Sequence, residues 1–255
     1  MTERQRIQDI LKPRVVFRAT IQRDRIRASN RLSALNRQKG FLSDQEREMM
    51  TPWFDRVETI WTNHHNRLIE QETQMDEELR DLAGDFRIVR EMTALRGAGL
   101  LLAAKVIGLI DIEKAETVSK LWRYAGYGLT AKGIIDRRTK GETMKYNQGL
   151  KTSCRVLTVS MMRSNSPYRA VYDEAREVYA ARPDWSAGHQ HSAALRKMTK
   201  IWLAHLWNVW RTLEGLPAQA PYIFHDPRHT HQIMPTDMGW QVEIRAVREP
   251  PVQPQ

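Results

Sequence analysis

Apolar residues recur every seven positions along the first third of the chain, and this spacing predicts long helices. A heptad repeat places its apolar residues in one seam along a helix, where a second helix can pack. Gly40 interrupts the repeat, and Ser43 and Glu46 form a capping box at the start of the next helix. The pattern predicts two long helices, paired either as an antiparallel hairpin or as a dimerising coiled coil. The seam positions are Ile21, Ala28, Leu35 and Leu42 in the first helix and Phe54, Trp61, Leu68, Met75, Leu82 and Val89 in the second.

The rest of the chain predicts shorter helices and then a tail. Apolar residues with a period near 3.6 favour amphipathic helices, and glycine or proline lies at several of their boundaries. Seven of the eleven prolines fall within residues 216–255, where we expect an extended chain. The expected fold is all-α, with a helical arm over 1–92, a compact helical domain over 93–215 and the Pro-rich tail. The shorter helices are expected at residues 87–95, 100–110, 118–125, 148–162, 168–181 and 191–213.

The charge of the chain indicates a polyanionic partner. Forty Lys and Arg residues against thirty Asp and Glu give a formal net charge of +10, and basic surfaces attract nucleic acid. The distribution is uneven, with eleven cations against three carboxylates in residues 1–42 and nine against two in 120–155, but six against thirteen in 43–93. We therefore expect DNA or RNA at the two basic segments. The alternative is a charge that serves solubility alone.

Cysteine usage and hydropathy indicate a cytoplasmic protein. Cys154 is the single cysteine, which excludes an internal disulfide and fits a reducing compartment. Its helical context predicts a small core residue. The charged N-terminus does not resemble a signal peptide. No run of about 18 apolar residues predicts a membrane span, so we expect no membrane association.

A glycine-rich turn between two predicted helices is the first candidate site. Gly97 and Gly99 allow positive φ and close backbone approach, as in a helix-hairpin-helix. Backbone amides at the start of the following helix can bind phosphate. The alternative is an ordinary connection between helices, which glycine commonly makes. The residues of this turn are Arg96, Gly97, Ala98 and Gly99.

A basic loop downstream of the turn is the second candidate site. Cations neutralise phosphates and release counterions, and interleaved aromatic rings can stack on bases. Acidic residues are almost absent from this segment, which favours a nucleic-acid site over a merely solvated loop. The predicted contacts are Lys132, Arg137, Arg138, Lys140, Lys145, Tyr146, Asn147, Lys151 and Arg155, together with the glycine-rich turn.

Three other patterns have simpler interpretations. The basic helix from Val16 to Leu42 either follows a nucleic-acid backbone or pairs with the acidic helix 43–93. The spacing of Trp202, Leu206, Trp210 and Leu213 predicts core or a subunit interface. The segment from His225 to His231 contains zinc ligands but has no second ligand group nearby, so it predicts a solvated turn. We expect no metal site and no cofactor.

The order of several motifs resembles the C-terminal domain of Piv-invertase-like transposases, the bridge-RNA-guided recombinases of the insertion-sequence one-ten group. That family has a Pro-Gly-Ile-Gly hairpin, an Ala/Leu helix, an Ile-Gly-Asp turn and a Tyr-Ala-Gly-Leu segment. The resemblance covers residues 14–215 and implies DNA recombination or transposition, with a structured guide RNA as a further partner. The matching segments are Arg23–Gly40, Arg96–Gly99, Ala103–Ala104, Gly108–Asp111, Tyr124–Gly126, Arg137–Gly141, Asn147, Asn165–Tyr172 and Ala194–Arg211.

The chain departs from this family in two ways. It starts at the coiled coil, so the RuvC-like domain with its DEDD carboxylates is missing. The family's catalytic serine follows the Tyr-Ala-Gly segment, where this chain has only Thr130, Thr139 and Thr143. A threonine nucleophile needs an activating base, and none is evident in the sequence.

We therefore predict a nucleic-acid-binding protein without catalysis of its own, which forms a homo-oligomer through the helical arm. One alternative is an active recombinase subunit, in which Thr139 or Thr143 replaces the serine or another protein supplies the carboxylates. The other alternative is a helical scaffold that binds only protein.

Overall fold

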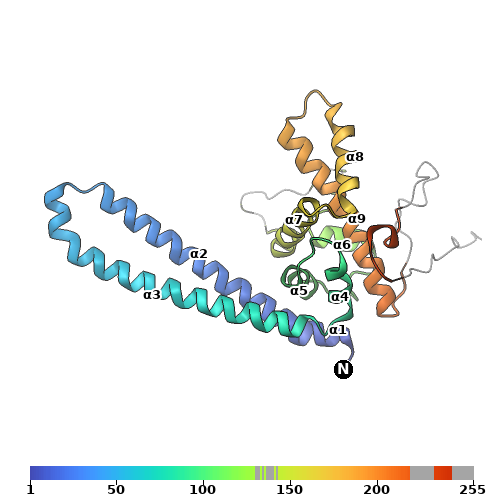
Figure 1. The fold of residues 1–255 in the computed structure, drawn as a ribbon, viewed down its shortest axis with the longest axis horizontal. Helices are drawn as coiled ribbons and strands as arrows, with labels where there is room; N and C mark the ends of the chain where they lie inside the picture. The colour runs from blue at the N-terminus through green and yellow to red at the C-terminus, as the bar shows by residue number, and fades with distance from the viewer. Residues whose placement is uncertain (130–132, 134, 136–140, 142, 219–232, 243–255) are drawn as a thin grey trace, which may run out of the picture. The chain divides into compact units, whose positions relative to one another are not determined.

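The computed structural model describes residues 1–129, 133, 135, 141, 143–218 and 233–242, and the fold is all-α as predicted. The two long helices and the shorter ones lie close to the ranges that the apolar periodicity predicts (Figure 1). The elements are α1 (Glu3–Arg6), a π-helical turn (Ile7–Leu11), α2 (Lys12–Gly40), α3 (Asp44–Ala83), α4 (Arg87–Ala94), α5 (Leu100–Gly108), α6 (Val118–Tyr124), α7 (Gln148–Arg163), α8 (Tyr168–Ala180), α9 (Ala187–Leu213) and a 3-10 helix (Thr236–Met238).

The chain divides into two units whose boundaries differ from the predicted arm and domain. The hairpin unit comprises Pro13–Asp81, and the compact unit comprises Met1–Lys12 with Leu82–Gln255. Both ends of the predicted arm are therefore part of the compact unit. Ile7 and Leu11 at one end and Ile88 at the other are fully buried. The heptad pattern runs through Val89 without interruption, so it gives no signal of this boundary.

The hairpin unit consists of α2 and α3, which pack antiparallel along the predicted seam. Buried Ile21 and Ala28 of α2 pack against Leu68 and Met75 of α3, with Trp61 beside them. The capping box at the start of α3 is present, with the Ser43 amide donating to the Glu46 carboxylate at 2.9 Å. The basic helix therefore pairs with the acidic helix, which was one of the two interpretations of their opposite charges.

Buried ion pairs hold the two helices of the hairpin in register. The Arg18 guanidinium donates to both carboxylate oxygens of Asp76, at 2.7 and 3.0 Å, and lies 2.6 Å from Glu72. Glu72 also accepts from Arg25. Arg18 is 6% exposed, so its charge depends on these carboxylates for compensation.

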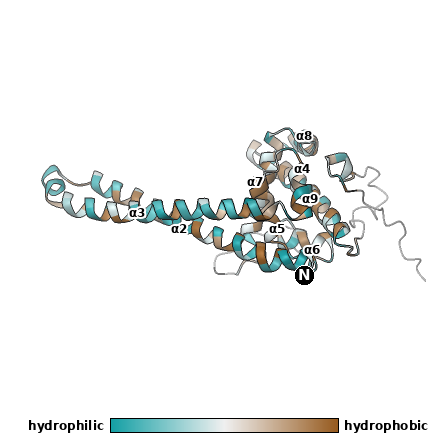
Figure 2. Cartoon of the chain, turned by 60° about the horizontal axis from the view of Figure 1, so that its bottom comes forward, coloured by the Kyte–Doolittle hydropathy of each residue, from teal (hydrophilic) through white to brown (hydrophobic). Residues whose placement is uncertain are grey.

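The core of the compact unit is built around α9. This helix contacts α4, α6, α7 and α8. Trp202, Leu206 and Trp210 of the predicted stripe are buried as core, and Leu213 is half-buried. Figure 2 shows hydrophobic residues along α5, α7 and α9, whereas hydrophilic residues predominate along α2 and α3. Cys154 is fully buried, as expected for a core residue, and burial raises the pKa of its thiol. None of the described helices is long and apolar enough to cross a membrane.

Part of the predicted extended tail packs into the compact unit. Trp240 is 2% exposed, and its Nε1–H donates to the Tyr168 hydroxyl at 2.8 Å. The same hydroxyl lies 2.7 Å from His205 Nδ1, and His205 Nε2 lies 3.0 Å from the Ile233 carbonyl oxygen. Residues 233–242 are therefore structured, in contrast to the prediction, because a large indole and its hydrogen bond hold them in the core.

Candidate nucleic-acid interface

The glycine-rich turn links α4 to α5, and close packing explains its first glycine. Gly97 has φ of +88°, and a Cβ there would lie 2.8 Å from Met161 Cα and 2.9 Å from the Ser160 carbonyl oxygen. Such contacts with backbone atoms leave no room for a side chain. Ala98 is also buried. Arg96 and Gly99 are exposed, so only these two positions of the turn face solvent.

The glycine-rich turn contacts one end of α7, and Tyr146 and Asn147 of the basic segment lie at its other end. Asn147 caps the N-terminus of α7, with its side-chain oxygen accepting from the Leu150 amide at 2.9 Å. The turn contacts Met161, close to the C-terminus of α7. At 1.5 Å of rise per residue, about 20 Å of helix separates these points. The sequence had led us to expect one phosphate site formed by the turn and the basic segment together. The structure instead separates the turn from the start of α7.

Several of the predicted site residues lie outside the described residues, namely Lys132, Arg137, Arg138, Thr139 and Lys140. The segment from His225 to His231 lies outside them too. Among the described residues, no three His, Cys, Asp or Glu side chains gather as metal ligands.

Thr143, the other hydroxyl candidate for catalysis, is exposed. Within the part of the chain that the structure describes, no hydrogen bond joins its hydroxyl to a general base. The described residues therefore provide no activation for this hydroxyl.

The structure does bring together a group of basic side chains around Tyr127, which connects α6, α7 and α9. The Tyr127 hydroxyl donates to the Lys151 carbonyl oxygen of α7 at 3.3 Å. The Arg196 guanidinium of α9 lies 5.5 Å from the Tyr127 ring and donates to the Gly128 carbonyl oxygen at 2.9 Å. Arg155 of α7 also acts on Tyr127, since its charge partly offsets the effect of burial, which raises the pKa of the phenol.

Two further cations lie against aromatic rings beside this centre. The Lys200 ammonium lies 4.1 Å from the centre of the Trp122 ring, and the Trp122 indole donates to the Lys200 carbonyl oxygen at 2.9 Å. The Lys151 ammonium lies 4.3 Å from the centre of the Tyr146 ring. Exposed Arg123 and Lys145 adjoin these rings in the chain. We refer to the whole set as the cation cluster: Arg123, Lys145, Lys151, Arg155, Arg196 and Lys200.

No carboxylate among the described residues balances the cation cluster. Helices α6, α7 and α9 contain nine Lys or Arg and no Asp or Glu. Among the described residues, none of the six side chains lies within 4.0 Å of a carboxylate oxygen. Burial, reinforced by the charge of Arg196, lowers the pKa of Lys200. Burial also lowers the pKa of Arg196. An anion bound here would relieve this repulsion.

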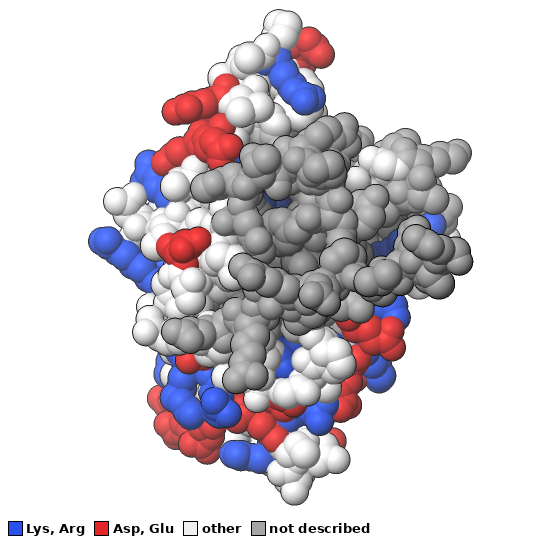
Figure 3. Space-filling view, turned by 90° about the vertical axis from the view of Figure 1, so that its right-hand side faces the viewer, with Lys and Arg blue, Asp and Glu red and all other residues white. Residues whose placement is uncertain are grey.

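The face of the molecule drawn in Figure 3 is not organised in this way. On the face drawn in Figure 3, acidic and basic side chains are interspersed. Elsewhere on α9, Lys197 lies 3.5 Å from Glu174. The cation cluster therefore differs from this face in having no carboxylate partner among the described residues.

A tight turn after α6 fixes the geometry of the cluster. Gly126 has φ of +75°, and a Cβ there would lie 2.8 Å from Lys151 Cδ and 2.9 Å from Tyr146 Cδ2. The Asn147 amide donates to the Tyr124 carbonyl oxygen at 2.8 Å. These contacts tie the end of α6 to the start of α7, and they hold the predicted residues Tyr146, Asn147 and Lys151 in place.

Sequence reasoning missed the contribution of α9 and α6. Arg196, Lys200 and Arg123 lie far from the basic loop in sequence or at the end of a short helix, and the apolar stripe of α9 predicted only core. The signal that was available is the absence of Asp and Glu from residues 187–213. This absence does not indicate which residues lie next to these cations in the folded chain.

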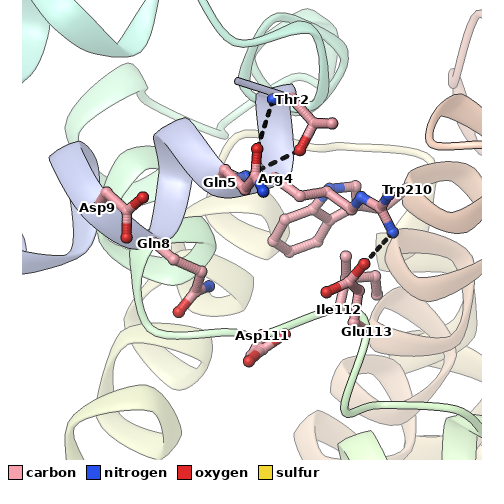
Figure 4. A pocket seen from close by; sticks show the side chains of 9 residues that line it. All are labelled: Thr2, Arg4, Gln5, Gln8, Asp9, Asp111, Ile112, Glu113 and Trp210. Carbon is pink, nitrogen blue, oxygen red and sulfur yellow. Dashed lines mark hydrogen bonds and ion pairs between the residues drawn. The ribbon is translucent and has the colours of Figure 1, made fainter.

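A cavity of about 160 Å³ lies elsewhere in the compact unit. Figure 4 shows Arg4 bonded to Glu113 and Thr2 bonded to Gln5 at its wall. Gln8 donates to the Ile110 carbonyl oxygen at 2.9 Å. Acidic and basic groups are mixed in the wall of this cavity, so it does not indicate a polyanion site.

Comparison of the chain with protein-family models finds no match. Comparison with curated proteins finds none either.

Proposed function

We propose that the compact unit binds the phosphate backbone of nucleic acid through the cation cluster. The observation that supports this most directly is the gathering of four cations, Lys151, Arg155, Arg196 and Lys200, with no carboxylate partner among the described residues. Arg123 and Lys145 adjoin them in the chain. Like charges held together in this way destabilise a protein unless an anion compensates them. A run of phosphates is the polyanion that a basic protein most commonly meets.

The aromatic rings of the cluster favour contacts with phosphates over contacts with bases. Lys200, Lys151 and Arg196 each lie over a ring, namely Trp122, Tyr146 and Tyr127. A ring face covered by a cation is not free to stack on a base. The rings instead position the cations, so we expect binding with little dependence on base sequence.

The salt dependence of affinity tests this proposal. Each cation that neutralises a phosphate contributes about 0.9 to the slope of log affinity against log salt for duplex DNA. The double variant Lys151→Gln with Arg155→Gln should therefore lower the slope by about 2. Fluorescence anisotropy with a labelled DNA duplex measures this directly.

Lys197→Gln is the matched control, because Lys197 belongs to α9 but lies beside Glu174. This variant should leave the slope unchanged. Equal effects of the control and the double variant would show that total charge, and not the cluster, drives binding. A protein that binds no nucleic acid at low salt would contradict the proposal and favour the protein scaffold.

We also propose that the chain is a relative of the Piv-invertase-like transposases, acting on DNA in the cytoplasm with a guide RNA as a further partner. The order of matching motifs from Arg23 to Arg211 supports this relation. Among the described residues no base is bonded to the Thr143 hydroxyl, which favours binding without catalysis. Strand cleavage that persists in purified protein and disappears in Thr143→Ala or Thr139→Ala would instead support an active recombinase.

A further inference from the structure

A second apolar face of α3 is left uncovered by α2. Met49, Trp53 and Ile60 are 72%, 52% and 60% exposed. At 100° per residue, these three positions fall within an arc of about 40° and extend over about 16 Å of helix. The seam positions Phe54 and Trp61 lie about 100° away around the helix. We call the three exposed residues the outer stripe.

We infer that the outer stripe pairs with the same stripe of a second copy of this chain, with the two α3 helices antiparallel. A two-fold axis between Trp53 and Arg56 makes residues equally far from that point face each other. Met49 then lies against the partner's Ile60, and Trp53 lies against the partner's Arg56. Each contact occurs twice, which is the mark of a self-complementary surface.

The chemistry of the facing residues supports this register. Arg56 is exposed and has no ion pair or hydrogen bond within the described part of the chain, and an indole face accommodates a guanidinium. The same register extends outward, where it brings exposed Gln45 to the partner's exposed His64.

A second copy fits this surface better than a parallel arrangement or an apolar peptide. In a parallel pair, Trp53 would face Trp53 and Arg56 would face Arg56, which repel each other. An apolar peptide would leave Arg56 without a partner. The α2–α3 seam is already satisfied within the chain, so the hairpin needs no exchange of helices in order to associate.

Cysteine crosslinking tests the register. We expect a mixture of the single variants Met49→Cys and Ile60→Cys to form an intermolecular disulfide on oxidation, because the antiparallel register brings these positions together. Each variant alone should crosslink far more slowly. The native thiol, Cys154, is buried, and the unmodified chain serves as the control. Preferred crosslinking of Met49→Cys with itself, or no crosslink in the mixture, would overturn the inference.

Light scattering on substituted chains provides an independent test. Trp53→Glu and Ile60→Glu should shift the protein from dimer to monomer while circular dichroism shows intact helices. Ile69→Glu is the matched control, because Ile69 is 42% exposed on the opposite side of α3 and should leave the dimer intact. A chain that is monomeric before substitution, or dissociation by all three variants, would overturn the inference. Neither experiment depends on nucleic-acid binding.

Discussion

The hydroxyl of Tyr168 and Nδ1 of His205 lie 2.7 Å apart in the interior of the compact unit. Trp240 and the Ile233 carbonyl complete a chain of hydrogen bonds that joins α8, α9 and the C-terminal segment. Burial lowers the pKa of His205 to about 4, although its bond to Ile233 and the charge of Asp237 act in the opposite direction. The imidazole is therefore neutral in the folded protein at neutral pH.

We expect this histidine to make folding sensitive to mild acid. Between pH of about 6.5 and about 4 the unfolded chain binds a proton at His205 and the folded chain does not, so stability is complete above this range and falls with pH. The slope attributable to His205 is about 1.4 kcal/mol per pH unit. Urea denaturation across this range, compared between the native chain and His205→Gln, measures it. An equal slope in both proteins would contradict the prediction.

Gly97→Ala should destabilise the compact unit strongly. The substitution combines a left-handed backbone, which costs an L-residue about 1–2 kcal/mol, with a Cβ placed 2.8 Å from Met161 Cα. We expect a loss of more than about 2 kcal/mol in the free energy of unfolding. Gly99→Ala is the control, because its Cβ would meet nothing within 4 Å and its φ is negative. Comparable losses in the two variants would show that packing against α7 is not the reason for Gly97.

Arg18→Ala should destabilise the hairpin unit. Removal of the Arg18 guanidinium leaves the carboxylates of Glu72 and Asp76 without their shared cation. Breaking a buried ion pair costs about 3–5 kcal/mol. Thermal unfolding followed by circular dichroism gives the measurement. Arg27→Ala removes an ion pair with Asp24 whose arginine side chain is 73% exposed, and it should change little. A small effect of Arg18→Ala would mean that water already screens this site.

Trp240→Ala should loosen the C-terminal segment and weaken the core around Tyr168. Truncation of a buried tryptophan costs about 3–5 kcal/mol. Limited proteolysis should then cut residues 233–242 faster than in the native chain, and urea denaturation should show the lost stability. Gln241→Ala keeps the indole and is the control. Unchanged protection of the segment in Trp240→Ala would show that other contacts hold it.

Much of the fold could be predicted because its elements have local causes. Ser43 and Glu46 cap α3 through side chains three residues apart, and the apolar period of α9 places Trp202 and Trp210 on one buried side. The contact of Gly97 with Met161 could not be predicted in this way. It depends on how α7 packs against the turn, and no local pattern encodes that distance.

The candidate site was predictable in part. Tyr146, Asn147, Lys151 and Arg155 lie close together in sequence and share the start of α7. Arg196 joins them only through folding, because about forty residues separate it from Arg155. The burial of Trp240 could not be predicted either, because the Pro-rich sequence around it indicates an extended chain.

The three carbonyl oxygens of Gly126, Tyr127 and Gly128 all accept from the guanidinium of Arg196. This one side chain thus fixes the direction of the backbone where it leaves α6. A substitution at position 196 would therefore redirect the chain where it leaves α6 and would also remove a cation of the cluster. A lower affinity for nucleic acid in an Arg196 variant can therefore result from the altered backbone direction as well as from the loss of a contact with phosphate.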